Sequence, residues 1–257
     1  MKLSKIFALA ALAAFAATAN AQFANTSKSS GRLTSSGIIV KDCNSYSRLE
    51  LGYLGTNFRT KYSDNYFDYL FEDYDEDDCD NLFDDLKGFT VGYTRGISLS
   101  PKIPIFLEVG PQVNFGTYKE TEGGDYYYDD DDDEITHRYN LLTLAVPVTF
   151  TGKLSFNNGC YIAPYLGIHF DVNLLYNVKD KYSFSYRGDS GSETDTENLF
   201  EEDGYKRFQM GFQSGVNFGY KKINLGIGYR GNFMPIYKEG GIKVKTGGLV
   251  VALGYNF

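Results

Sequence analysis

The sequence predicts an all-β fold, an eight-stranded antiparallel up-and-down transmembrane β-barrel. Eight stretches alternate apolar and polar residues with a period of two, the pattern of a half-buried strand. Short and long connections alternate between these stretches, as in barrels of the outer membrane. The chain also begins with a secretion signal and ends on an aromatic residue, Phe257, at the close of the last stretch.

The N-terminal region has the three parts of a secretory signal. Lys2 and Lys5 precede an apolar stretch at residues 6–17, and Ala19 and Ala21 form an A-x-A cleavage site. We therefore predict a signal peptide at 1–21, a flexible periplasmic lead-in at 22–44 and an outer-membrane β-barrel at 45–257. No later segment has the roughly 18 consecutive apolar residues of a membrane helix. Because only helices and closed barrels satisfy every backbone polar group in lipid, the mature chain needs a closed barrel to span a membrane.

The eight predicted strands follow one another along the chain. They are residues 47–53, 89–99, 105–117, 140–150, 162–176, 208–220, 223–230 and 243–257. The clearest is 208–220, in which an apolar face with Phe208 and Phe212 alternates with a face of Gln, Gly and Asn. In the second strand Arg95 falls on the apolar face, which predicts a bulge or an interfacial position.

The connections between strands differ in length from one end to the other. The short ones lie near residues 100–102, 155–158 and 221–222. The long ones are predicted at residues 60–86, 118–137 and 180–204, with a shorter hairpin at 237–241. This asymmetry predicts tight periplasmic turns, long outer loops and both chain ends in the periplasm.

A period of two does not say which face is outside, and a lipocalin-like soluble barrel would carry its apolar face inside. Three features favour the membrane barrel. The second face is rich in Gly, Ser, Thr and Asn and poor in charge, which suits the crowded lumen of an eight-stranded barrel. Tyr and Phe gather near strand ends, as in the aromatic girdles of membrane barrels, and the chain ends on an aromatic.

Five segments, at residues 142–150, 163–170, 212–218, 225–230 and 253–257, resemble the PorT-like outer-membrane β-barrel domain family. The resemblance covers roughly residues 45–257 and carries no catalytic residue. It implies a barrel that is delivered by the export pathway and inserted by the barrel-assembly machinery. That machinery would read the C-terminal strand as an assembly signal through Leu253, Tyr255 and Phe257. The acidic loops are particular to this chain.

A few charged residues fall on the predicted lumen face. They are Arg48, Glu50, Glu108, Asp171 and Arg230. Buried ions are costly unless paired, so we expect salt bridges among them. One interpretation is a gate or a narrow ion path whose salt bridges change partners. The interpretation we favour is a satisfied polar plug in a barrel too small to conduct.

Two acidic runs, residues 73–80 and 125–134, fall in predicted outer loops. Carboxylates are ligands for hard cations such as calcium, yet the EF-hand spacing is absent. Interleaved Tyr and Phe could instead make an adhesive surface for an extracellular protein. The interpretation we favour is ordinary solvated loop packing above the barrel, because blocks of like charge repel one another.

Catalysis and cofactor binding have little support. The histidines are His137, at a loop edge, and His169, on the lumen face beside Asp171, and neither lies in a recognisable catalytic motif. We predict no enzyme, no cofactor and no metal. The net charge of -8 argues against a nucleic-acid partner. Of three cysteines, Cys43 and Cys160 are both placed at the periplasmic end, so theirs is the plausible disulfide.

These observations predict a non-enzymatic protein of the Gram-negative outer membrane. Its expected partners are outer-membrane lipid and the export and barrel-assembly machinery, with extracellular protein or divalent cations as candidates at the acidic loops. The expected role is surface structure, adhesion or support of secretion. The alternative is a porin-like channel for small solutes or ions.

Overall fold

The computed structural model describes residues 39–40, 42–61, 85–123, 134–186 and 189–257. The predicted signal peptide, most of the lead-in, Cys79 and both acidic runs up to residue 133 lie outside the described residues. In the part of the chain that is described, no helix is long and apolar enough to cross a membrane.

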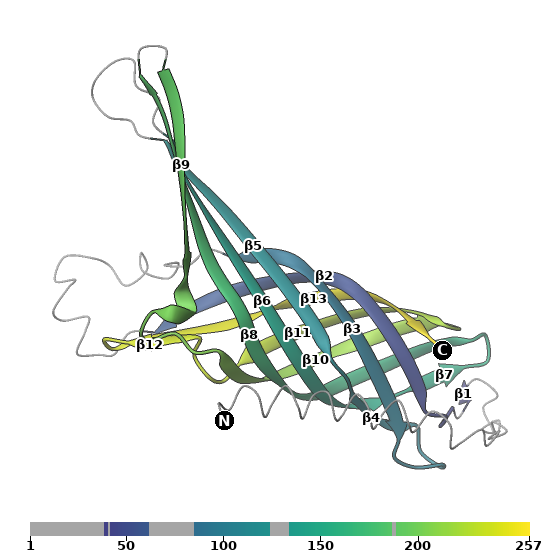
Figure 1. Ribbon diagram of the computed structural model, residues 1–257. Coiled ribbons are helices and arrows are strands. Elements are labelled where there is room, and N and C mark those ends of the chain that lie inside the picture. The colour runs from purple at the N-terminus through teal and green to yellow at the C-terminus, as the bar shows by residue number, and fades with distance from the viewer. Residues whose placement is uncertain (1–38, 41, 62–84, 124–133, 187–188) are drawn as a thin grey trace, which may run out of the picture.

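Eight antiparallel strands close into a ring, as predicted (Figure 1). In ring order they are β2 (Tyr46–Lys61), β3 (Leu86–Ser98), β4 (Ile105–Val109) continued by β5 (Gln112–Gly123), β6 (Glu134–Gly152), β8 (Cys160–Tyr186), β10 (Phe208–Tyr220), β11 (Ile223–Asn232) and β13 (Ile242–Asn256). The last strand pairs with the first from Lys243 opposite Lys61 to Asn256 opposite Arg48, which closes the barrel.

Four short strands and one 3-10 turn complete the fold. They are β1 (Ile39–Val40), β7 (Leu154–Phe156), β9 (Asp189–Asn198), η3 (Leu199–Glu201) and β12 (Tyr237–Glu239). The pairing of β1 with β7 means that the end of the predicted flexible lead-in is a strand. β12 and β13 form the predicted hairpin around Gly240 and Gly241, which have φ of 56° and 89°. A two-residue hairpin loop favours residues with positive φ, which glycine adopts without steric cost.

The apolar side chains of the ring face outward and the polar ones face inward. Leu51, Leu166 and Leu253 are 61%, 63% and 61% exposed, whereas Asn173 and Asn224 are each 1% exposed. A soluble lipocalin-like barrel would show the opposite arrangement. The ring is therefore a transmembrane β-barrel, whose surface band is solvated by lipid chains.

We call the end of the barrel that bears the long connections the long-loop end, and the opposite end the short-turn end. Several strands extend beyond the ring at the long-loop end.

The prediction of a loop over residues 180–204 was wrong. β8 continues to Tyr186, and β9 returns alongside it from Asp189 to Asn198. Together with the ends of β5 and β6 they form a sheet that projects beyond the ring (Figure 1).

Small residues on the lumen face make room for large ones. A Cβ atom on Gly219 would lie 2.0 Å from the ring of Tyr161, and one on Gly228 would lie 2.0 Å from the hydroxyl of Tyr165. Gly219 and Gly228 therefore leave room for two lumen tyrosines. Arg95 lies near the short-turn end and donates to the Ser47 hydroxyl at 2.9 Å. The pairing of β2 with β3 is uninterrupted there, so of the two expectations for Arg95 the bulge was wrong.

Candidate functional site in the barrel lumen

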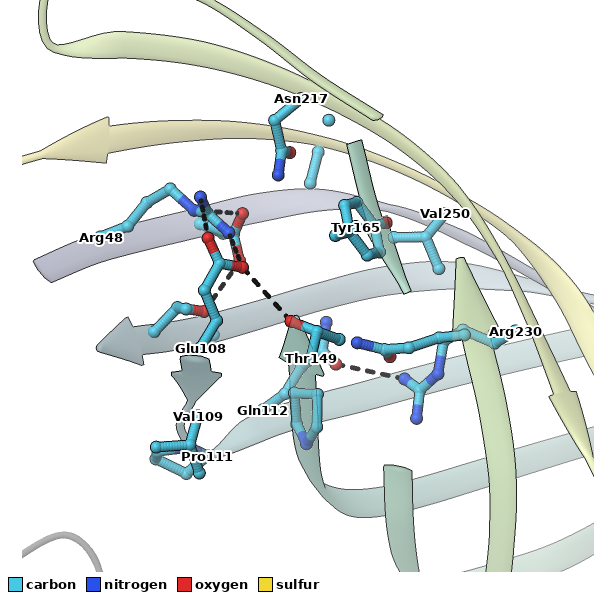
Figure 2. A pocket seen from close by; sticks show the side chains of 17 residues that line it. Arg48, Glu108, Val109, Pro111, Gln112, Thr149, Tyr165, Asn217, Arg230 and Val250 are labelled. Atoms are coloured by element: carbon cyan, nitrogen blue, oxygen red, sulfur yellow. Dashed lines mark hydrogen bonds and ion pairs between the residues drawn. The ribbon is translucent and has the colours of Figure 1, made fainter. Parts of the chain in front are cut away.

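The first ionic cluster lies in the half of the lumen nearest the short-turn end. Arg48 contacts two carboxylates: its Nε lies 2.7 Å from Glu50 Oε1, and its Nη2 lies 3.2 Å from Glu108 Oε2. Figure 2 shows Arg48 and Glu108 pointing toward each other across the lumen. Tyr46 donates its hydroxyl to Glu108. Because Arg48 and Glu108 are 5% and 4% exposed, their pairing is what makes their burial tolerable.

Neutral donors complete this cluster. Thr94 donates to Glu50 at 3.2 Å, and Thr149 donates to Glu108 at 3.4 Å. One guanidinium therefore faces two carboxylates, and hydroxyl groups supply further hydrogen bonds to both. Hydrogen bonds to a charged group are stronger than those between neutral groups, which helps to hold this arrangement in place.

The second ionic cluster lies nearer the long-loop end. Arg230 Nη2 is 2.8 Å from Asp171 Oδ1 and 3.1 Å from His169 Nδ1, while His169 Nδ1 is 3.0 Å from the same carboxylate oxygen. The predicted contact between His169 and Asp171 is thus confirmed. Arg230 Nη1 donates to the Gln112 amide oxygen at 3.2 Å (Figure 2).

The five predicted lumen residues thus form two separate groups. Arg48 pairs with Glu50 and Glu108, and Arg230 pairs with Asp171. Among the described residues no ion pair links the two groups. A chain of salt bridges that exchange partners along the lumen is therefore not present in this state of the barrel.

The free space in the lumen is small and divided. One cavity of about 60 Å³ is lined by residues that include Arg48, Glu108, Tyr165 and Arg230. A second cavity of about 50 Å³ is lined by residues that include His169, Asn173 and Arg230. Since a water molecule occupies about 30 Å³ of liquid, each cavity holds only a few waters. Arg230 lines both cavities.

Above the second cavity, an apolar plug fills the long-loop end. Its buried members are Phe58, Leu86, Leu141, Tyr176, Leu199, Ile236 and Val244. Five of these belong to ring strands, whereas Leu199 lies in η3 and Ile236 lies in the connection between β11 and β12. Two connections therefore fold over the lumen and supply apolar side chains to its mouth.

Specific contacts hold these connections over the lumen. The Ile236 N–H donates to the Val244 carbonyl at 2.8 Å, and the rings of Tyr176 and Phe200 are 6.0 Å apart. The Tyr205 and Tyr237 rings are 4.8 Å apart, and burial raises the pKa of Tyr205 to about 12. This plug was not predicted from the sequence. Its only signal was the pair Leu199-Phe200 within an acidic segment.

The short-turn end is closed by aromatic rings and one lysine. Phe106 is 0% exposed, and its ring packs edge to face with Tyr46 at 5.2 Å. Lys153 Nζ lies 2.6 Å from Asp42 Oδ2 and 4.8 Å from the centre of the Tyr161 ring. A cation over an aromatic face is attracted by the ring quadrupole, so Lys153 links this end of the lumen to the N-terminal segment.

The remaining predicted residues lie outside the lumen. Leu253, Tyr255 and Phe257 are 61%, 50% and 53% exposed on the outward face. Phe257 exchanges two backbone hydrogen bonds with Ser47. His137 lies in β6, where its Nδ1 is 2.7 Å from Asp180 Oδ1.

No disulfide joins Cys43 and Cys160, so the disulfide considered for this pair does not form in the structure. In the described ranges, no three His, Cys, Asp or Glu residues group as metal ligands would.

No protein-family model matches this chain. No curated protein matches it. Among solved structures it is similar to Ail, the attachment invasion locus protein of Yersinia pestis, with 16% identity and a TM-score of 0.28 over 82% of this chain and 98% of Ail. Ail in complex with the heparin analogue sucrose octasulfate matches at 16% identity and a TM-score of 0.33, over 83% and 99%. Neisserial surface protein A (NspA) matches at 14% identity and 0.35, over 83% and 97%. Similarities this low establish no function for the chain.

Proposed function

We propose that this chain is a non-enzymatic protein of the Gram-negative outer membrane, whose closed barrel holds an extended sheet and long loops at the cell surface. The observation that carries the proposal is the filling of the lumen. Among the described residues, two ionic clusters and an apolar plug occupy the lumen, and the cavities between them include two of about 60 and 50 Å³. A barrel filled in this way serves as an anchor, and its long-loop end is where contact with the surroundings occurs.

Planar-bilayer recording of the purified protein tests whether the lumen is closed. We expect no steady conductance, because both cavities are small and Leu199 of η3 packs in the apolar plug above them. The rival proposal is a channel for small solutes or ions. Steady openings that vanish in Arg230→Ala or Glu108→Ala would establish the channel and refute the anchor.

Location in the outer membrane is supported by the outward apolar band and by the predicted signal peptide at 1–21. Short turns of such barrels face the periplasm, so the projecting sheet would lie outside the cell. The folded, membrane-inserted barrel should migrate differently on a gel before and after heating. Identical mobility in both samples would rule out a stable membrane barrel.

Membership of the PorT-like family, with insertion by the barrel-assembly machinery, is part of this proposal. The exposed C-terminal row Leu253, Tyr255 and Phe257 is the proposed assembly signal. Deleting Phe257 should reduce the amount of folded barrel in outer membranes several-fold. Its matched control is Leu99→Ala, which alters an outward apolar residue that is 50% exposed at the same end. Normal insertion of the variant without Phe257 would refute the proposed role of this residue in assembly.

The surface role is proposed to be structural, adhesive or supportive of secretion. Extracellular protein is the candidate partner of the projecting sheet and acidic loops, and divalent cations are a second candidate there. A pull-down with the intact barrel as bait, compared with a variant whose β8–β9 hairpin is shortened, should recover a partner only with the intact protein. If the intact barrel and the shortened variant recovered the partner equally, the partner would not bind through the β8–β9 hairpin.

An outer-membrane enzyme is the remaining class. The buried His169 contacts Asp171 through Nδ1, and among the described residues its Nε2 has no hydrogen-bond partner, so no nucleophile is hydrogen-bonded to the imidazole there. We expect His169→Ala to retain the biological activity of the chain wherever the variant folds. Loss of activity in a normally folded His169→Ala variant would reopen the enzymatic proposal.

A further inference from the structure

The outward face of β5, β6 and β8 changes character in layers toward the long-loop end. Residues directly opposite one another on the three strands form rows. The first row is apolar: Phe115, Leu142 and Leu175. The second row is polar and uncharged: Thr117, Asn140 and Asn177. The third row is basic: Lys119, Arg138 and Lys179. We call this third row the basic row.

The spacing of the layers matches the boundary of a bilayer. Phe115 and Lys119 are four residues apart on one strand, a separation of about 14 Å along the strand. With strands tilted by about 40°, this is about 10 Å along the membrane normal, which is comparable with the thickness of the headgroup region on one side of a bilayer. With apolar side chains in the lipid tails, the basic row lies at the level of the headgroups. Lys119, Arg138 and Lys179 are all exposed.

Like charges placed directly opposite one another on neighbouring strands destabilise a sheet. The basic row contains two such pairs, Lys119 with Arg138 and Arg138 with Lys179. Among the described residues, none of the three side chains forms an ion pair or a side-chain hydrogen bond. Within the described part of the chain, no anion therefore offsets this repulsion.

By register, the acidic residues of β5, β6, β8 and β9 lie on the other face of this sheet, with the exception of Glu134 in β6. Glu120 is opposite His137, which is opposite Asp180 in turn, and this row alternates with the basic row. Asp180 is engaged by His137 at 2.7 Å. In a chain with a net charge of -8, one face of the projecting sheet is thus basic while the other carries carboxylates.

A second basic row lies on the outward face of neighbouring strands. Lys238 is opposite Lys243, and Lys243 is opposite Lys61. All three are exposed, and Arg59 opposite Lys245 lies two residues nearer the apolar band. Asp85 lies in the same region and accepts a hydrogen bond from the Asn57 amide at 2.8 Å. A row of exposed basic residues therefore recurs at this end of the barrel in the described ranges.

From these observations we infer that the basic row Lys119, Arg138 and Lys179 binds the phosphate groups of an anionic glycolipid in the outer leaflet. Arg and Lys bind phosphate through charge-assisted hydrogen bonds, and a row of three could hold more than one phosphate. Charge complementarity and the position just beyond the apolar band together favour a lipid headgroup. The inference rests on the proposed location in the outer membrane.

Binding of lipid A to the folded barrel in zwitterionic detergent tests this inference. The test variant replaces Lys119, Arg138 and Lys179 with Gln. The matched control replaces Lys102, Lys221 and Lys222 with Gln, which removes the same charge from exposed residues at the short-turn end. Since each basic residue at an anionic surface contributes about fivefold in affinity, we expect the test variant to bind on the order of 100-fold more weakly. The control should bind like the unmodified protein.

Further binding measurements distinguish lipid phosphate from other anions as the ligand of the basic row. Lipid A without phosphates should bind weakly to all three proteins, and Lys119→Arg with Lys179→Arg should preserve binding of the phosphorylated form. Equal lipid A binding by the test variant and the control would overturn the inference. So would loss of heparin or inorganic phosphate binding in the test variant while lipid A binding is kept.

The chain's own acidic loop is the other possible occupant of the basic row. If lipid A bound only after residues 129–133 were changed from Asp to Asn, the loop would be the occupant and the inference would fail. Insertion of each variant into phosphatidylcholine vesicles, followed by heat-modifiable gel mobility, is the separate test of the membrane barrel. Failure there contradicts the proposed function, whereas insertion without lipid A recognition contradicts only the inference.

Discussion

The two halves of the lumen are closed by different physical means. Near the short-turn end, buried ions and hydroxyls fill the barrel, with Arg48 held between Glu50 and Glu108. At the long-loop end, apolar and aromatic side chains fill it, with Leu199 and Ile236 inserted from connections. The short-turn end depends on charge pairing and the long-loop end on the burial of apolar surface, and the pair of Arg230 with Asp171 lies below the apolar plug. One barrel thus contains both a polar interior, as expected beneath a lipid-facing surface, and a small conventional hydrophobic core.

This difference has a consequence for how each half fails. A buried ion pair tolerates the loss of one partner poorly, because the remaining charge is left uncompensated. An apolar plug loses stability in proportion to the side chain removed and to the cavity that remains. The polar half should therefore respond sharply to single changes, and the apolar half in smaller steps.

The largest effect is expected for Arg48→Ala. It leaves Glu50 and Glu108 buried without their cation, which should lower the free energy of unfolding by about 3–5 kcal/mol. Urea unfolding in lipid vesicles, followed by tyrosine fluorescence, measures this directly, since the chain has 22 Tyr and no Trp. The matched control removes all three charges together, as Arg48→Met with Glu50→Leu and Glu108→Leu, and should be far closer to neutral. A loss below 1 kcal/mol in Arg48→Ala would show that the cluster is not what fills this half.

Next in size is Leu199→Ala in the plug. Truncation of a buried leucine should cost about 2–4 kcal/mol and increase hydrogen exchange in η3 and the neighbouring connections. Leu99→Ala is the control, because Leu99 is 50% exposed while Leu199 is 8% exposed. If both variants lost the same stability, the plug would not be a packed core.

Gly219→Ala tests steric crowding in the short-turn half. The new Cβ would lie 2.0 Å from the Tyr161 ring, so the ring must move, at a cost of about 1–3 kcal/mol. Shortening the opposing side chain with Tyr161→Leu should recover part of the loss in a double-mutant cycle. Gly152→Ala is the matched control, since no atom lies within 4 Å of its added Cβ. Additive losses in the double variant would contradict direct contact.

The smallest effect concerns two exposed acids beyond the plug. A hydrogen bond with Glu202, and then its negative charge, raise the pKa of Glu197 above its ordinary value of 4.5. Because the folded chain holds this proton more tightly than the unfolded chain, the stabilisation is present below pH 4.5 and is lost as the pH rises through the raised pKa. Glu202→Gln should lower the pKa of Glu197, and an NMR titration of its side chain measures the change. If the pKa of Glu197 were the same in Glu202→Gln as in the unmodified protein, the two carboxyl groups would not interact.

The sequence was sufficient to predict the ring of eight strands. It was not sufficient to predict the sheet and the apolar plug at the long-loop end. Residues 208–220 were predicted as a strand and form β10 with the same limits, because lipid on one side and a polar lumen on the other impose a strict alternation. β9, by contrast, reads Asp-Ser-Gly-Ser-Glu-Thr-Asp-Thr-Glu-Asn and has polar residues on both faces. It is a strand because its backbone pairs with β8, and hydrophobic periodicity carries no trace of that pairing.

The lumen site shows the same limit. His169 and Asp171 were predicted as neighbours because residues two apart on a strand share a face. The distribution of ion pairs was not predictable, since Arg48 of β2 reaches Glu108 of β4 across β3, and the register of these strands is not visible in the alternation of the sequence. Leu199 and Ile236 were missed because isolated apolar residues in polar connections look the same whether they are exposed or inserted.

The seam between β2 and β13 also constrains the order of events during biogenesis. Every other pairing in the ring joins strands that follow one another along the chain, whereas this one joins residues 48–61 to residues 243–256. Local hairpins form quickly, and contacts between distant segments form slowly. The two free edges must therefore stay apart until the final strand arrives, and during that interval both can pair with a foreign strand. Residence time in this open form, rather than the stability of the finished ring, would then determine how much of the protein reaches the membrane.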